Sequence, residues 1–86
     1  MNDFLINIGF NNMVVSSRIV AVVSPLSNPM KRMKEESKNN GKLIDVTQGR
    51  KTRAIIIMDS GHIILSALNP ETISQRINGE ESKKKI

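Results

Sequence analysis

The chain has 86 residues, a net charge of +5, 2% aromatic residues and no cysteine. This length gives room for one domain with a small core, placed at residues 1–79, and we expect oligomerisation to reinforce it. The lack of cysteine excludes disulfides and thiolate metal sites. No apolar run reaches the roughly 20 residues that span a membrane, and the N-terminus has no basic segment typical of a signal peptide, so we expect a cytoplasmic protein.

The N-terminal part of the chain predicts two strands. In residues 4–10 the apolar side chains alternate with a period of two, and both phenylalanines, Phe4 and Phe10, look like core residues. Residues 9–12 supply a turn or bulge, and a second strand is expected over 13–23.

A helix is expected next, because Asn28 can accept an unpaired backbone N–H and Pro29 fits the first helical position. It should run to about Asn40, with Gly41 after its end. Its expected inner stripe is Met30, Met33 and Ser37, and its expected outer face is Lys31, Lys34 and Lys38.

Three further strands are expected at 43–47, 52–58 and 63–68, joined by a basic turn at 48–53 and a tight turn at 59–62. Strands that follow one another through such short turns predict a meander.

The C-terminal part predicts a short helix that begins at Asn69-Pro70, docks through Ile73 and Ile77, and ends at Gly79. Residues 80–86 are charged and lack apolar periodicity, so we expect a disordered tail. The predicted fold class is therefore α+β, with a small meander-type sheet of about five strands and two helices.

Two expected strand segments, 19–23 and 54–58, are apolar on both faces. One explanation is a homo-oligomer that buries strand faces or edges between subunits. The other is that both helices cover one face of the sheet and loops suffice for the other face.

The positive charge is concentrated in one segment. Between Lys31 and Arg53 there are eight cations and three anions, so this segment holds the whole net charge of +5. Arg50, Lys51 and Arg53 lie in the turn between two expected strands, where a sheet would hold them in place. Such clustering is the electrostatic footprint of phosphate-backbone binding.

Enzymatic chemistry has little support in the sequence. His62 is the only histidine, so it cannot anchor a familiar metal site, and no catalytic triad is evident. Residues 49–52 look superficially like a phosphate-binding loop but lack its upstream glycine. We therefore predict no catalytic residue, no metal, no cofactor and no small-molecule substrate.

Short strings spread over nearly the whole chain match one known pattern: 4–10, Arg18, 24–25 with 29–33, 43–45, 49–54, 58–60 and 70–72. In these strings the chain closely resembles the RemA family of small bacterial transcriptional regulators, which are named for the control of biofilm extracellular-matrix genes. The resemblance implies a ring-shaped homo-oligomer that binds double-stranded DNA.

The resemblance also implies roles for individual residues. In the family a basic pair after the glycine of the turn contacts DNA, which places that role on Arg50 and Lys51, and Arg18 matches a functional arginine. Lysine at the second position keeps a charge for phosphate but loses the bidentate guanidinium fork. The full set of predicted DNA-binding residues is Arg18, Lys31, Arg32, Arg50, Lys51 and Arg53.

A ring would repeat the basic turn at regular intervals, so that weak contacts add up. We expect DNA bound to such a ring to bend or to wrap around it. Two alternatives stay open: a module that binds duplex RNA, and a structural ring protein without a nucleic-acid ligand. Single-strand readers stack bases on aromatic side chains, which this composition disfavours.

Overall fold

A four-stranded mixed sheet organises residues 5–79, the part of the chain that the computed structural model describes. Its order is β3-β5-β6-β4. The bounds are Ile19–Val23 for β3, Leu43–Asp45 for β4, Ala54–Met58 for β5 and Ile63–Ser66 for β6. β5 pairs antiparallel with both β3 and β6, whereas β4 pairs in parallel with β6. The two central strands are rich in isoleucine, as expected for strands that are covered on both faces.

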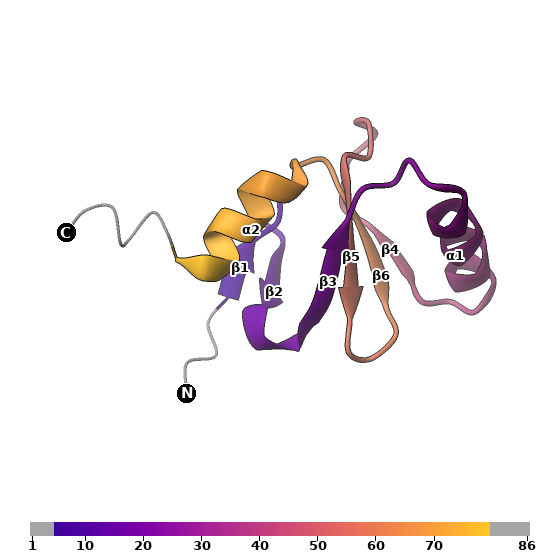
Figure 1. Ribbon diagram of the computed structural model, residues 1–86, viewed down its shortest axis with the longest axis horizontal. Coiled ribbons are helices and arrows are strands. Elements are labelled where there is room, and N and C mark those ends of the chain that lie inside the picture. The colour runs from indigo at the N-terminus through magenta and orange to yellow at the C-terminus, as the bar shows by residue number, and fades with distance from the viewer. Residues whose placement is uncertain (1–4, 80–86) are drawn as a thin grey trace.

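Each face of the sheet has its own cover (Figure 1). Helix α1, Asn28–Asn39, packs Met30 and Met33 against the side of Ile55 and Leu65. The opposite side, which includes Ile56 and Ile64, is covered by helix α2 and a separate hairpin. That helix spans Pro70–Asn78, and the hairpin strands are β1, Leu5–Asn7, and β2, Met13–Val15.

Both faces of the apolar strands are covered within one subunit. The explanation by two helices on one face and loops on the other is wrong, because α1 covers one face while α2 and the hairpin cover the other. The homo-oligomer explanation stays a prediction and is confined to the strand edges. What remains open are the two edges of the sheet. Val20 on the edge strand β3 is 66% exposed, and Ile44 on the other edge strand, β4, is 42% exposed.

The predicted meander of about five strands is wrong in two places. β4 does not pair with β5, its successor in the chain, but lies in parallel on the far side of β6. The expected strand over 13–23 is two strands, because the 3-10 turn Ser16–Arg18 separates β2 from β3 and sends them to different sheets. The described residues therefore contain six strands.

The predicted helices are confirmed with one change at a cap. Ser27, and not Asn28, is the N-cap of α1, since its hydroxyl accepts from the N–H of Met30. The expected inner stripe holds, with Ser37 buried. For α2 the cap positions Asn69 and Gly79 are as predicted, but the side chain of Asn69 forms no capping hydrogen bond. Within residues 5–79, neither helix has the length and apolar character needed to cross a membrane.

Phe10 is not the core residue that the alternating pattern predicted. β1 ends at Asn7, and the chain turns at Gly9–Asn12 so that Phe10 lies at the tip with 42% of its surface exposed. Strand alternation therefore stops short of this residue. Phe4 and the tail expected at 80–86 lie outside the described residues.

The side chain of Ser66 connects the hairpin to β6. The hydroxyl of Ser66 on β6 is fully buried and donates to the C=O of Ile8 at 2.7 Å, and it accepts from the N–H of Leu68 at 3.1 Å. We predict that Ser66→Ala lowers the free energy of unfolding by about 1–3 kcal/mol, because it leaves the buried C=O of Ile8 and the half-buried N–H of Leu68 without this partner. Denaturant unfolding measures this.

The matched control is Ser17→Ala at an exposed position of the 3-10 turn. It should change the free energy of unfolding by no more than about 0.5 kcal/mol. An equally small effect of Ser66→Ala would contradict the role assigned to this hydrogen bond.

Candidate nucleic-acid interface

The connection from β4 to β5, residues 46–53, crosses the carboxyl end of β6, and we call it the basic loop. It has to cross there because β4 and β5 lie on either side of β6. Both ends of the loop bond to the end of that strand. The N–H of Val46 donates to the C=O of Leu65 at 3.0 Å, and the N–H of Arg53 donates to the C=O of Ser66 at 2.9 Å. The loop is therefore fixed at both ends to the centre of the sheet.

A second set of hydrogen bonds shapes the loop from within. One carboxylate oxygen of Asp45 accepts from the N–H of Thr47 at 2.9 Å and from its hydroxyl at 2.7 Å. The C=O of Thr47, a buried residue, accepts from the N–H of Arg50 at 3.1 Å. Gln48 and Gly49 both have positive φ, 54° and 82°, which reverses the chain direction at the tip. The tip is thus a defined turn.

The three cations of the basic loop are exposed and gather around shallow cavities. Arg50, Lys51 and Arg53, with Ala67, line a space of about 390 Å³. A second space of about 130 Å³ lies between Lys51, Arg53 and the segment 24–26. Across residues 5–79, none of these three cations forms an ion pair with an acidic side chain. Their charge is therefore free to bind an external anion.

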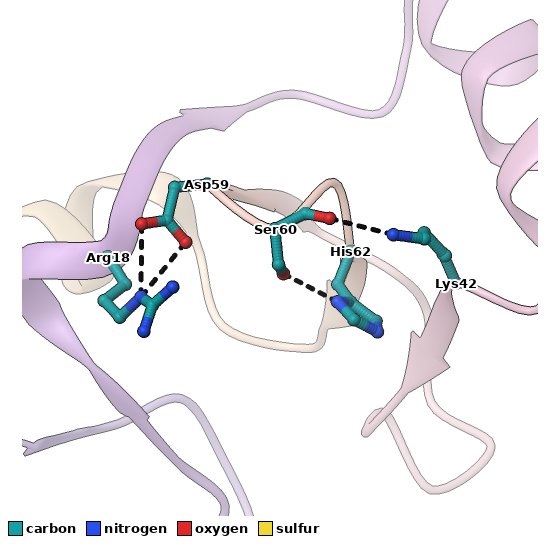
Figure 2. A network of polar contacts seen from close by, with 5 residues as sticks. All are labelled: Arg18, Lys42, Asp59, Ser60 and His62. Carbon is teal, nitrogen blue, oxygen red and sulfur yellow. Dashed lines mark hydrogen bonds and ion pairs between the residues drawn. The ribbon is translucent and has the colours of Figure 1, made fainter.

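Arg18 lies beside Asp59 (Figure 2), which is in the turn after β5 and therefore at the opposite end of that strand from the basic loop. Its Nε donates to both carboxylate oxygens of Asp59 at 3.1 Å each. Asp59 follows β5 and Arg53 precedes it, which places them about 20 Å apart along an extended strand. The structure therefore does not bring Arg18 together with the basic loop in one subunit.

The same end of the sheet carries two more polar contacts (Figure 2). The Nζ of Lys42 donates to the C=O of Ser60 at 3.0 Å, and the hydroxyl of Ser60 lies 2.6 Å from Nδ1 of His62. His62 is thus a turn residue. In the described part of the chain, no three His, Asp or Glu side chains group as a metal ion would require.

Lys31 and Arg32 lie in the first turns of α1, and both are exposed. They do not line either cavity of the basic loop. The predicted DNA-binding residues therefore fall into three groups: the basic loop, the start of α1, and Arg18.

One residue next to the basic loop, Phe10, was not predicted from the sequence as part of this surface. The guanidinium carbon of Arg50 lies 5.8 Å from the centre of the Phe10 ring, within the range of a cation–π contact. A signal for this was present in the sequence, because Gly9 and Asn11 to Asn12 are turn-forming residues that favour a loop tip over a strand.

The fold and the site define a small α+β domain with a cationic loop at one end of its sheet. This chain belongs to the RemA-like family. Residues 5–77 match that family, described as extracellular matrix regulatory protein A-like. A protein of Dictyoglomus turgidum is 62% identical over 92% of this chain and 93% of its own length.

Two further relatives support the same membership. One from Thermodesulfovibrio yellowstonii is 70% identical over 86% of this chain and 87% of its own length. One from Alkaliphilus metalliredigens is 56% identical over 100% of this chain and 92% of its own length. All three bear the name "putative regulatory protein". The names are those of regulatory proteins and not of enzymes.

The bonds that shape the basic loop predict a pH dependence. The pKa of Asp45 lies below its usual value of 3.8. The main cause is the hydrogen bond from the hydroxyl of Thr47, followed by the bond from the N–H of Thr47, and the charge of Lys34 also lowers the pKa, whereas burial raises it by less. A carboxyl with a lowered native pKa stabilises the fold above its unfolded pKa, and this contribution disappears as the pH falls through the native pKa.

We predict that Asp45→Asn destabilises the protein at about pH 5 and that the difference from the parent shrinks toward zero as the pH falls below 3.8. Denaturant unfolding over this range measures it, with the exposed Glu35→Gln on α1 as control. A difference that stays constant with pH would contradict the assigned role of the carboxylate.

Proposed function

We propose that the chain is a DNA-binding transcription regulator that acts in the cytoplasm as a ring-shaped homo-oligomer and binds double-stranded DNA through its basic loop. The observation that carries the proposal is the set of three exposed cations, Arg50, Lys51 and Arg53. They lie on a loop that is hydrogen-bonded at both ends to β6. The family description supports control of extracellular-matrix genes, as in biofilms.

The chemistry of the loop suits a phosphate backbone. Each guanidinium of Arg50 and Arg53 can donate two parallel hydrogen bonds to a phosphate, whereas Lys51 supplies a point charge. The loop's shape is already set in the free protein, so little conformational entropy remains to be lost on binding. One subunit would make about three phosphate contacts, which is weak binding by itself.

Duplex DNA fits the surface better than single-stranded nucleic acid. The chain has no tryptophan and no tyrosine, and Phe10 is the only aromatic residue between residues 5 and 79. A surface that reads single strands stacks successive bases on several aromatic rings. The cationic loop can instead follow the phosphates of a duplex. Arg18, Lys31 and Arg32 are proposed as additional contacts for DNA that extends beyond the basic loop.

The two edges of the sheet support a head-to-tail assembly. A groove of about 500 Å³ runs between β3 and α2 and is lined by Ser16, Ile19 to Val22, Pro70, Glu71, Ser74 and Ile77. The pairing of β3 with β5 shifts register at Val20, which makes this edge of the sheet irregular. A neighbouring subunit would therefore meet side chains here and not a straight row of unpaired backbone groups. The opposite edge carries the exposed Ile44.

A contact between two different surfaces of the same chain repeats from subunit to subunit and closes a ring when the rotation allows it. In such a ring the basic loops recur at regular intervals. Linked contacts raise the effective concentration of each loop at the DNA, which converts weak individual contacts into stable binding. Regular spacing on a curved surface favours DNA that bends easily, so bending cost can contribute to specificity.

We predict that Arg50→Ala weakens binding to an AT-rich duplex of about 60 base pairs by roughly tenfold or more, because the loss is repeated in every subunit that touches the DNA. The dependence on salt should become shallower. Lys51→Arg, which restores the guanidinium fork, should strengthen binding. Fluorescence anisotropy over a series of salt concentrations measures all three effects.

Lys38→Ala on the outer face of α1 is the matched control, since it removes one exposed cation outside the basic loop. It should bind nearly as the parent does. If the parent binds no duplex DNA at low salt, the DNA-binding proposal fails. Equal or tighter binding to duplex RNA would favour the alternative ligand.

We predict that Val20→Glu and Ile44→Glu each reduce the mass of the assembly to that of a single subunit, because each places a charge in one half of the contact. An equimolar mixture of the two variants should form dimers, since one variant keeps an intact groove and the other keeps an intact β4 edge. Light scattering measures the masses.

Leu5→Glu, on the exposed outer side of the hairpin, is the control and should leave the mass unchanged. A parent protein that is monomeric would contradict the assembly. A mixture that stays monomeric would show that the groove and the β4 edge do not meet.

A further inference from the structure

The turn between β1 and β2 holds a bulky residue in an unfavourable backbone conformation. Phe10 and Asn11 have φ values of 54° and 65°, and the N–H of Asn12 donates to the C=O of Gly9 at 3.0 Å, so the two central residues of the turn are both left-handed. Asparagine and glycine adopt this conformation readily, whereas a phenylalanine there is unusual. Local energetics do not explain why position 10 carries a ring.

The surrounding contacts keep the turn in this shape. The side chain of Asn7 accepts from the N–H of Gly9 at 2.7 Å, and the amide of Asn12 donates to the C=O of Gly9 at 2.9 Å. The C=O of Ile8 accepts from the buried hydroxyl of Ser66, whose own C=O accepts from the N–H of Arg53. The same residue of β6 therefore bonds to the hairpin and to the basic loop, and it fixes the two turns side by side.

The ring of Phe10 does not serve the core, because 42% of the residue is exposed at the tip of the turn. The guanidinium of Arg50 lies over the ring, with 5.8 Å between its central carbon and the ring centre. A guanidinium on an aromatic face is attracted by the ring quadrupole and keeps its N–H groups free at the rim. The contact restricts Arg50 without using its hydrogen-bond donors.

We propose that Phe10 is a positioning residue of the DNA interface, whose ring orders the Arg50 side chain so that its guanidinium is already directed outward when phosphate arrives. This inference rests on the proposed function of the basic loop. A long arginine side chain loses rotamer freedom when it binds, and a side chain that is ordered beforehand loses less. The unfavourable conformation of the turn is then balanced by a gain at the interface.

Three substitutions separate the ring from its bulk and from the turn. Phe10→Tyr keeps the aromatic face. Phe10→Leu keeps apolar bulk but removes that face, and Phe10→Asn removes both while it suits a positive φ. Asn11→Gly is the matched control, because it alters the same turn without removing the ring. Circular dichroism and light scattering establish that each variant is folded and assembled like the parent.

The first readout needs no DNA. In the parent and in Phe10→Tyr, the ring should shift the NMR signals of the Arg50 side-chain protons upfield, and this shift should be absent in Phe10→Leu and Phe10→Asn. The second readout is the affinity for duplex DNA, which should fall by about threefold or more in the latter two variants and not in Phe10→Tyr or Asn11→Gly. In an Arg50→Ala background the same substitutions should cause no further loss.

Arg50 signals that are the same with and without the ring would overturn the proposal. So would unchanged DNA affinity in Phe10→Leu and Phe10→Asn, or an equal loss with and without Arg50. If the parent binds no DNA while the ring shift is present, the proposed function fails and the contact itself stands. The two failures are therefore distinguishable.

Discussion

The position of β6 between an antiparallel and a parallel neighbour is the constraint on which the rest of the structure depends. All four of its residues are buried, and its backbone pairs on both sides. Because β4 runs parallel to β6 and β5 runs antiparallel to it, the chain leaves β4 at the end of the sheet where β5 begins. The connection must cross the end of β6, and Val46 and Arg53 bond to it there. The most cationic loop is thus fixed to the least exposed strand.

The two ends of the sheet consequently differ in chemistry. At one end Arg50, Lys51 and Arg53 have no acidic partner among residues 5–79, whereas at the other end Asp59 pairs with Arg18 (Figures 1 and 2). In the described part of the chain, three cations without an acidic partner therefore lie at the basic-loop end, against Lys42 at the other end. In the proposed ring, all basic loops would lie on the same side, where their fields add and attract a polyanion. The hairpin contributes to this end through Phe10.

Local signals in the sequence located the helices and the turns, but not the strand order. Pro29, Pro70 and Gly79 act through the conformation of a single residue, so the helix limits were predicted closely. The parallel pairing of β4 with β6 joins residues far apart in the chain, and an alternating pattern has no information about which strand lies next to which. Phe10 was misplaced because alternation does not reveal where a strand ends. The grouping of Arg50, Lys51 and Arg53 in one turn was predicted from charge and turn residues alone, whereas the proposed function came from the resemblance to a family.

Hydrogen–deuterium exchange of the protein, with and without duplex DNA, tests most directly which end of the sheet binds nucleic acid. The account predicts that DNA slows exchange of the amides of residues 48, 49, 51 and 52 in the basic loop and of those in the adjoining turn at 10–11. The turn at 59–62, next to Arg18, should change much less. Protection centred on 59–62, or no protection at either end, would contradict the account.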